Sequence, residues 1–253
     1  MTGLIRAEWA KVTRRKLAWI LALVSVALSG IGTAFTLILA DILEGTDELV
    51  LPPPTKPEAY VSALQSAAGN TWVPIILVTI IVAGEYAKGT WPVSLTWDSR
   101  RTRHLGAKFM VLTAVSAAII LITAVVTLAI TVVLAEGSGF LTFGEISVII
   151  GKVLLVQVAW VGIALLGSVL FRSAALAVGL TLGFSFAEQI LGLLPIYRRI
   201  SLSNAVTGIF GQFDLTGIVP IYVPDPPVAA AVLAGWTALS LTVAVLIAVR
   251  RDA

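Results

Sequence analysis

Residues 109–135 read FMVLTAVSAAIILITAVVTLAITVVLA, a run of 27 residues without a charge. A helix rises about 1.5 Å per residue, and about 20 apolar residues are enough to cross the hydrocarbon core of a bilayer. A strand of a membrane barrel needs only about 10 residues and alternates apolar with polar positions, unlike this continuous run. The run therefore predicts a membrane-spanning helix.

The whole chain has the same apolar bias. Of its 253 residues, 58% are hydrophobic and 12% are charged, and the mean hydropathy is +1.00. Soluble domains carry about 25% charged residues, so we expect an integral membrane protein. The absence of cysteine excludes disulfides and thiolate metal sites. The net charge of +3 does not indicate nucleic-acid binding, because in a membrane protein the positions of Lys and Arg matter more than their sum.

We predict an all-α membrane protein with six spanning helices in one transmembrane domain, residues 1–253. The predicted spans are residues 17–40, 72–85, 109–135, 146–171, 174–195 and 227–249. Residues 17–40 exceed the roughly 7–15 apolar residues of a cleavable signal, so we expect them to stay in the membrane. The second span is short, and we expect its helix to start a turn or more before residue 72.

The basic residues predict the orientation of the chain. Thirteen of the 17 Lys and Arg residues fall on one side of a six-span arrangement, in residues 6–16, in the 86–108 loop, at Arg172 and at the C-terminal end. Acidic residues gather on the opposite side. Because cytoplasmic segments are enriched in Lys and Arg, we expect both termini in the cytoplasm.

Two segments outside the spans have their own predicted structure. Residues 1–16 place Leu4, Ile5, Trp9 and Val12 at roughly helical spacing among basic residues, which favours an amphipathic helix in the headgroup plane that contacts membrane lipid. The alternative is a flank that only fixes the topology. Residues 196–226 are broken by Gly and Pro, so we expect short outer-leaflet helices there, one of them capped by Ser201 or Ser203.

Polar and small residues within the spans allow two interpretations each. A lone charge inside a bilayer costs several kcal/mol, so Lys152 and Glu188 should face protein or water, together with Gln157. They form either a polar cavity, in which Lys152 and Glu188 can pair directly, or an arrangement in which Lys152 snorkels outward and Glu188 meets an outer loop. Gly179 and Gly183, four residues apart, serve packing within one subunit or a dimer seam.

Catalytic motifs are missing from the sequence. The single Gly-Lys pair, Gly151–Lys152, lacks the upstream glycine and the following hydroxyl of a phosphate-binding loop. His104 is the only histidine, which excludes a His-based triad and argues against a zinc site. We therefore expect no metal site, no bound cofactor and no bond-making chemistry in this chain.

The loop before residue 109 carries the features of a docking element. Residues 84–108 read GEYAKGTWPVSLTWDSRRTRHLGAK. Thr90 is placed to cap a short helix with proline in its first turn, where the missing N–H costs nothing. Trp91 and Leu95 lie one turn apart and would offer an apolar knob to a partner. Glu85, at the end of the second span, is placed to hold one of the arginines that follow the loop.

These residues resemble a known family. The pattern G-E-Y-x-x-G-T, followed by S-R-R-x-R and Lys108 at the next span, is similar to ABC-2 type transporter permeases, and L-I-R-A-E-W-x-K-x-x-R-R-K resembles the opening of that family. The six-span plan fits as well. One departure is Asp98–Ser99, which stands where the family often has a proline.

The resemblance implies a half-transporter without its own ATPase. Two copies, or this chain and a paralogous permease, would join two ATP-binding subunits, which would hold the ATP and Mg. The loop between spans two and three would be a cytoplasmic coupling helix. The coupling residues would be Glu85, Gly89, Thr90, Trp91, Leu95, Trp97, Arg100, Arg101 and Arg103.

The function that follows is export of a lipid-like or amphipathic substrate, a drug or a glycan, across the cytoplasmic (inner or plasma) membrane of a prokaryote. A secondary transporter is one alternative, but it would show a midplane ion site and internal repeats, and we see no repeat. A non-transport membrane scaffold or sensor is the other, and it would need no coupling loop.

Overall fold

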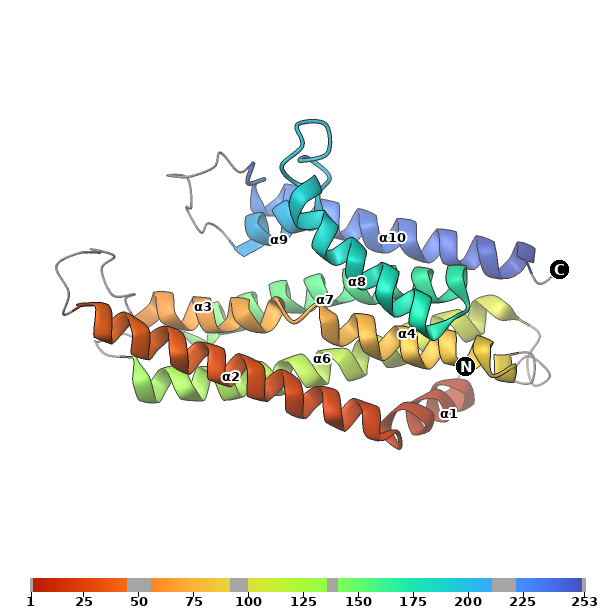
Figure 1. Cartoon of the computed structure of the whole chain (residues 1–253), viewed down its shortest axis with the longest axis horizontal. Helices are drawn as coiled ribbons and strands as arrows, with labels where there is room; N and C mark the ends of the chain where they lie inside the picture. The colour runs from red at the N-terminus through yellow and green to blue at the C-terminus, as the bar shows by residue number, and fades with distance from the viewer. Residues whose placement is uncertain (1, 45–55, 92–99, 136–140, 211–221, 252–253) are drawn as a thin grey trace. The chain divides into compact units, whose positions relative to one another are not determined.

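The computed structural model describes residues 2–44, 56–91, 100–135, 141–210 and 222–251, and these residues form helices and short connections without a strand (Figure 1). Within them, six helical stretches are long and apolar enough to cross a membrane: Lys16–Leu39, Ala59–Ala87, Arg101–Leu134, Phe143–Phe171, Ala174–Leu191 and Pro226–Arg250. The predicted all-α membrane class with six spans is confirmed.

The helices follow the predicted order along the chain. They are α1 (Thr2–Thr13), α2 (Lys16–Glu44), α3 (Lys56–Ala68), α4 (Trp72–Ala87), α6 (Arg101–Leu134), α7 (Phe143–Phe171), α8 (Ala174–Leu191), α9 (Leu202–Phe210) and α10 (Pro226–Arg251). The N-terminal segment is helical as expected, and its position at the membrane surface stays a prediction. The position of α9 in the outer leaflet also stays a prediction.

The second candidate span begins well before the predicted residue 72. Its helical residues start in α3, and only Gly69 to Thr71 separate α3 from α4. Within this stretch, Asn70 is buried and its Nδ2 donates to Ser29 Oγ at 2.7 Å. A polar side chain is tolerated there because α2 supplies its hydrogen-bond partner.

The chain divides into two compact units, one formed by Met1–Lys16, Thr71–Ser116 and Leu155–Ala253, the other by Leu17–Asn70 and Ala117–Leu154. In the first unit, a buried apolar core joins α4, α7, α9 and α10 around Trp160. The Trp160 ring lies edge-on to Phe184 at 6.3 Å between centroids. A Cβ at Gly162 would lie 3.6 Å from the Thr237 backbone, so this glycine lets α7 and α10 approach closely.

Hydroxyl groups join the helices of the second unit. Ser25 Oγ on α2 and Thr123 Oγ1 on α6 lie 3.0 Å apart, and both are buried. Thr127 Oγ1 on α6 is 3.5 Å from the Ala63 carbonyl oxygen on α3. Hydrogen bonds between membrane helices contribute about 0.6 kcal/mol each on average. Because most of each helix surface is apolar, polar contacts of this kind determine which faces of neighbouring helices pack together.

Glu188 holds the junction between α8 and α9 in the first unit. Its buried carboxylate accepts a hydrogen bond from the Leu202 backbone N–H at the start of α9. The adjacent Ser201 Oγ accepts from the Asn204 N–H at 3.3 Å, which confirms one of the two predicted caps. Burial and the Glu188 carboxylate raise the pKa of Tyr197, which lies beside this junction. Glu188 therefore meets the segment after α8, and its pairing with Lys152 stays a prediction.

Replacing Glu188 with Ala should destabilise the protein, because the buried Leu202 N–H loses its acceptor and the N-terminus of α9 loses a negative charge. We expect a loss of about 1–3 kcal/mol, seen as a midpoint several degrees lower in thermal unfolding of the detergent-solubilised protein. Glu188→Gln keeps an acceptor oxygen and should lose less. Gln189→Ala, at an exposed position one residue further along, is the control. Equal midpoints for Glu188→Ala and Gln189→Ala would contradict this role.

Candidate functional site

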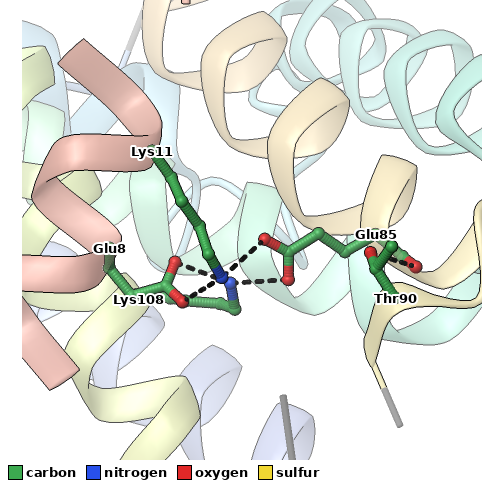
Figure 2. Close-up of polar contacts among 5 residues, drawn as sticks. All are labelled: Glu8, Lys11, Glu85, Thr90 and Lys108. Carbon is green, nitrogen blue, oxygen red and sulfur yellow. Dashed lines mark hydrogen bonds and ion pairs between the residues drawn. The ribbon is translucent and has the colours of Figure 1, made fainter. Parts of the chain in front are cut away.

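Four charged side chains from three helices meet in the first unit (Figure 2). Glu8 and Lys11 come from α1, Glu85 from the end of α4, and Lys108 from α6. Lys108 Nζ lies 2.8 Å from Glu8 Oε2 and 2.7 Å from Glu85 Oε2. Lys11 Nζ lies 2.8 Å from Glu8 Oε1 and 3.5 Å from Glu85 Oε1. The alternating charges close a ring, which we call the charge cluster.

The charge cluster is buried on all but one side. The exposed fraction is 1% for Lys108, 2% for Glu8 and 4% for Glu85, whereas the Lys11 side chain is 40% exposed. Two carboxylates and two ammonium groups give a formal charge of zero. Buried ions cost several kcal/mol each unless their partners compensate them. The closed ring supplies that compensation, so each member depends on the others.

Helix α1 contributes to the charge cluster through an unusual face. Its buried residues are Glu8 and Val12, one turn apart, while Arg6 and Trp9 lie on its exposed side. An interfacial helix is expected to bury apolar residues only. Here the buried face carries a carboxylate, so α1 is attached to its unit by an ionic contact in addition to an apolar one.

The charges of α1 shift one another's pKa values. Burial by itself raises the pKa of Glu8, but Lys108 and Lys11 outweigh it, and the pKa lies below its ordinary value of 4.5. Burial lowers the pKa of Lys11, but the Glu8 and Glu85 carboxylates outweigh it, and the pKa lies above 10.5. Both side chains are therefore charged at neutral pH.

The turn after α4 leads from the charge cluster into the predicted coupling segment. Gly89 has φ of +66°, a left-handed conformation that suits glycine at a helix C-terminus. Its N–H donates to the Tyr86 carbonyl at 3.1 Å. Thr90 Oγ1 donates to the Glu85 carbonyl at 3.2 Å, so its hydroxyl closes the end of α4 (Figure 2). Whether Thr90 also caps a following helix stays a prediction.

Trp91 lies inside its unit, with 2% of its surface exposed. Its ring stacks on Tyr86 at 4.7 Å between centroids, and Lys108 Nζ lies 5.7 Å from the Trp91 centroid. This differs from the expected exposed knob. An indole over a buried ammonium gains a cation–π contact as well as apolar burial, which accounts for the inward position. Leu95 and Trp97, the other predicted docking residues, lie outside the described residues.

The predicted arginines have different surroundings. Arg101 donates to the carbonyl oxygens of Ala248 at 3.3 Å and Val249 at 3.1 Å, near the C-terminal end of α10, where cations are favourable. Arg100 and Arg103 are exposed. Among the described residues, the cations paired with Glu85 are Lys108 and Lys11, where the sequence suggested one of these arginines.

Three members of the charge cluster were missed by sequence reasoning: Glu8, Lys11 and Lys108. A signal existed for two of them, because Glu8 is the single acidic residue in an otherwise basic N-terminal segment and Lys108 directly precedes an apolar run. Neither signal names a partner, since Glu8 and Lys108 are 100 positions apart. Sequence reasoning did select Glu85 and Trp91, which lie at or beside the charge cluster.

The predicted residues within the spans are separate from the charge cluster. Gln157 on α7 is buried and Lys152 is partly buried. Gly179 and Gly183 lie on an exposed side of α8, and a Cβ at either would meet no atom within 4 Å in the described part of their unit. Their role in a dimer seam stays a prediction.

The lowered pKa of Glu8 predicts how stability depends on pH. The stabilising effect of the Glu8 charge is fully present above pH 4.5, which is near the pKa of Glu in the unfolded chain. It is lost as the pH falls through the lower pKa that Glu8 has in the folded protein. Glu8→Gln should therefore unfold at a lower temperature than wild type at pH 7, and the gap should narrow below about pH 4.5. Thermal unfolding in detergent from pH 7 to pH 3 measures this.

Asp225→Asn removes an exposed carboxylate at a helix start, where Asn caps as well as Asp does, and it serves as the control. Its midpoint should follow that of wild type across the whole range. If the difference in unfolding midpoint between wild type and Glu8→Gln stays constant down to pH 3, the stabilising charge is not that of Glu8.

Comparison with known proteins adds one match. The family model described as ABC-2 family transporter protein matches residues 4–188, from α1 through most of α8. No curated protein matches the chain. The matched range is more than half of the chain and contains the entire charge cluster. The chain therefore belongs to the ABC-2 transporter family.

Proposed function

We propose that this chain is the permease subunit of an ABC exporter and that it takes its energy from separate ATP-binding subunits. Membership of the ABC-2 family carries the permease assignment, and members of this family are generally non-catalytic membrane subunits. The ATP and Mg would be held by the partner. Two permease copies, or one copy and a paralogue, would join two such partners in the cytoplasmic membrane of a prokaryote.

The segment between α4 and α6 is the proposed point of energy transfer. It is preceded by an ordered turn at Gly89 and by the buried anchor Trp91, which supports a rigid attachment of the segment to α4. Leu95 and Trp97 would contact the ATP-binding subunit. Arg100 and Arg103, both exposed, would face an acidic surface of that subunit or lipid phosphate. The burial of Trp91 changes its proposed role from docking to anchoring.

Transport would follow from movement of the two permease copies. ATP binding by the partners would draw the coupling segments together and shift the spans between inward-open and outward-open states. The open side of α8 at Gly179 and Gly183 is the proposed seam between copies, because small residues let helices approach closely in a membrane. The apolar spans suit a lipid-like or amphipathic substrate or a drug, and a glycan is the alternative.

A test coexpresses this chain with a candidate ATP-binding subunit, a protein with a phosphate-binding loop from the same organism. Leu95→Asp/Trp97→Asp should reduce copurification of that protein at least tenfold, because two charges would enter an apolar contact. Leu193→Asp/Leu194→Asp, at exposed positions after α8, is the matched control and should leave copurification unchanged. Stoichiometry is read by quantitative gel analysis of the detergent-solubilised complex.

Two results would contradict the proposal. If the wild-type chain binds no ATP-binding subunit, a secondary transporter or a membrane scaffold becomes the better interpretation. If the Leu95 and Trp97 variant keeps full stoichiometry, the partner docks elsewhere on the chain.

A further inference from the structure

We propose that Lys108 is a positioning residue that couples the segment starting at Trp91 to helix α1. The inference rests on the proposed function, because coupling requires an ATP-binding partner that acts on this segment. It deepens that function by naming the buried group through which the partner's motion reaches the N-terminal helix.

Within the described residues, the Lys108 side chain contacts three separate parts of the chain: α1, the end of α4 and Trp91. Its ammonium meets Glu8 of α1 at 2.8 Å and Glu85 of α4 at 2.7 Å. It also lies 5.7 Å from the ring centroid of Trp91, where the coupling segment begins. A lysine ammonium has three hydrogens to direct at its surroundings, so these contacts are compatible with one another.

Burial makes the contacts of Lys108 sensitive to displacement. With 1% of Lys108 exposed, solvent does not screen its ion pairs. A displacement of Glu85 therefore leaves an uncompensated buried charge unless Lys108 follows, and a displacement of Trp91 removes the cation–π contact of the ammonium. The ammonium is thus constrained to move with the end of α4 and the start of the coupling segment.

The second lysine gives the charge cluster a way to change partners. Lys11 touches both carboxylates and its side chain is 40% exposed, so it can retain Glu8 or Glu85 when Lys108 moves. Each carboxylate then keeps a cation in two different arrangements of the cluster. A switching element needs two discrete arrangements of this kind, rather than one that deforms continuously.

Helix α1 is the element that receives the displacement. Its buried contacts are Glu8 and Val12, and Glu8 is paired with Lys108. The chain passes from Thr13 at the end of α1 to Lys16 at the start of α2, so a shift of α1 acts on the beginning of the first span.

The experiment follows α1 directly in the complex with the ATP-binding subunit. The chain has no native cysteine, so Ala7→Cys on the exposed side of α1 gives a single labelling site for an environment-sensitive fluorophore. In the Ala7→Cys background, MgATP should change the fluorescence. Adding Lys108→Met should reduce that change at least fivefold while the ATP-binding subunit still copurifies. Lys88→Met, at an exposed lysine directly after α4, is the control and should keep the full response.

Lys108→Met leaves two buried carboxylates with one lysine, which disfavours folding of this variant. A second variant therefore tests the same contact without that imbalance of charge. Glu8→Gln/Lys108→Met removes one charge of each sign and leaves the Lys11–Glu85 pair. It should fold and still lose the response. A folded double variant with a full MgATP response would overturn the inference, since a purely structural role leaves the response of folded protein intact. Failure of the wild-type chain to bind the ATP-binding subunit would instead sink the proposed function, and the inference with it.

Discussion

The buried ammonium of Lys108 between the carboxylates of Glu8 and Glu85 is the interaction on which the attachment of α1 to the first unit depends. It joins the N-terminal helix α1 to the end of α4 and the start of α6, which come much later in the sequence. Removing a single charge from this arrangement is unfavourable because the remaining ions stay buried. The arrangement is therefore specific, whatever its net contribution to the free energy of unfolding.

The same physical constraint explains the polar groups elsewhere in the described chain. Asn70 lies within a candidate span because Ser29 pairs with it, and Glu188 is buried because the N-terminus of α9 supplies a donor. In an apolar environment, packing alone distinguishes one helix face poorly from another. Each satisfied polar contact selects one register and one partner, so these few residues define how the helices of a unit fit together.

Much of the fold follows from the sequence, because hydropathy summed over about 20 residues is a local property. The candidate site follows only in part. Glu85 and Trp91 were selected by their positions around the loop, yet the charge cluster was not predicted, because the pairing of Glu8 with Lys108 depends on tertiary contacts. Trp91 was expected at the surface, since apolar residues in a polar loop favour a docking role. The buried Lys108 ammonium beside Trp91 favours the inward position, and the local sequence pattern around Trp91 does not indicate this contact.

A double-mutant cycle on Glu8 and Lys108 measures whether these two buried charges stabilise each other. The free energies of unfolding of wild type, Glu8→Gln, Lys108→Met and the double variant are compared in one detergent at pH 7. We predict that the double variant is less destabilised than the sum of the single variants by about 1–3 kcal/mol, because each single change leaves the other charge buried without its partner. Additive losses within about 0.5 kcal/mol would show that the two side chains do not interact and would contradict the account.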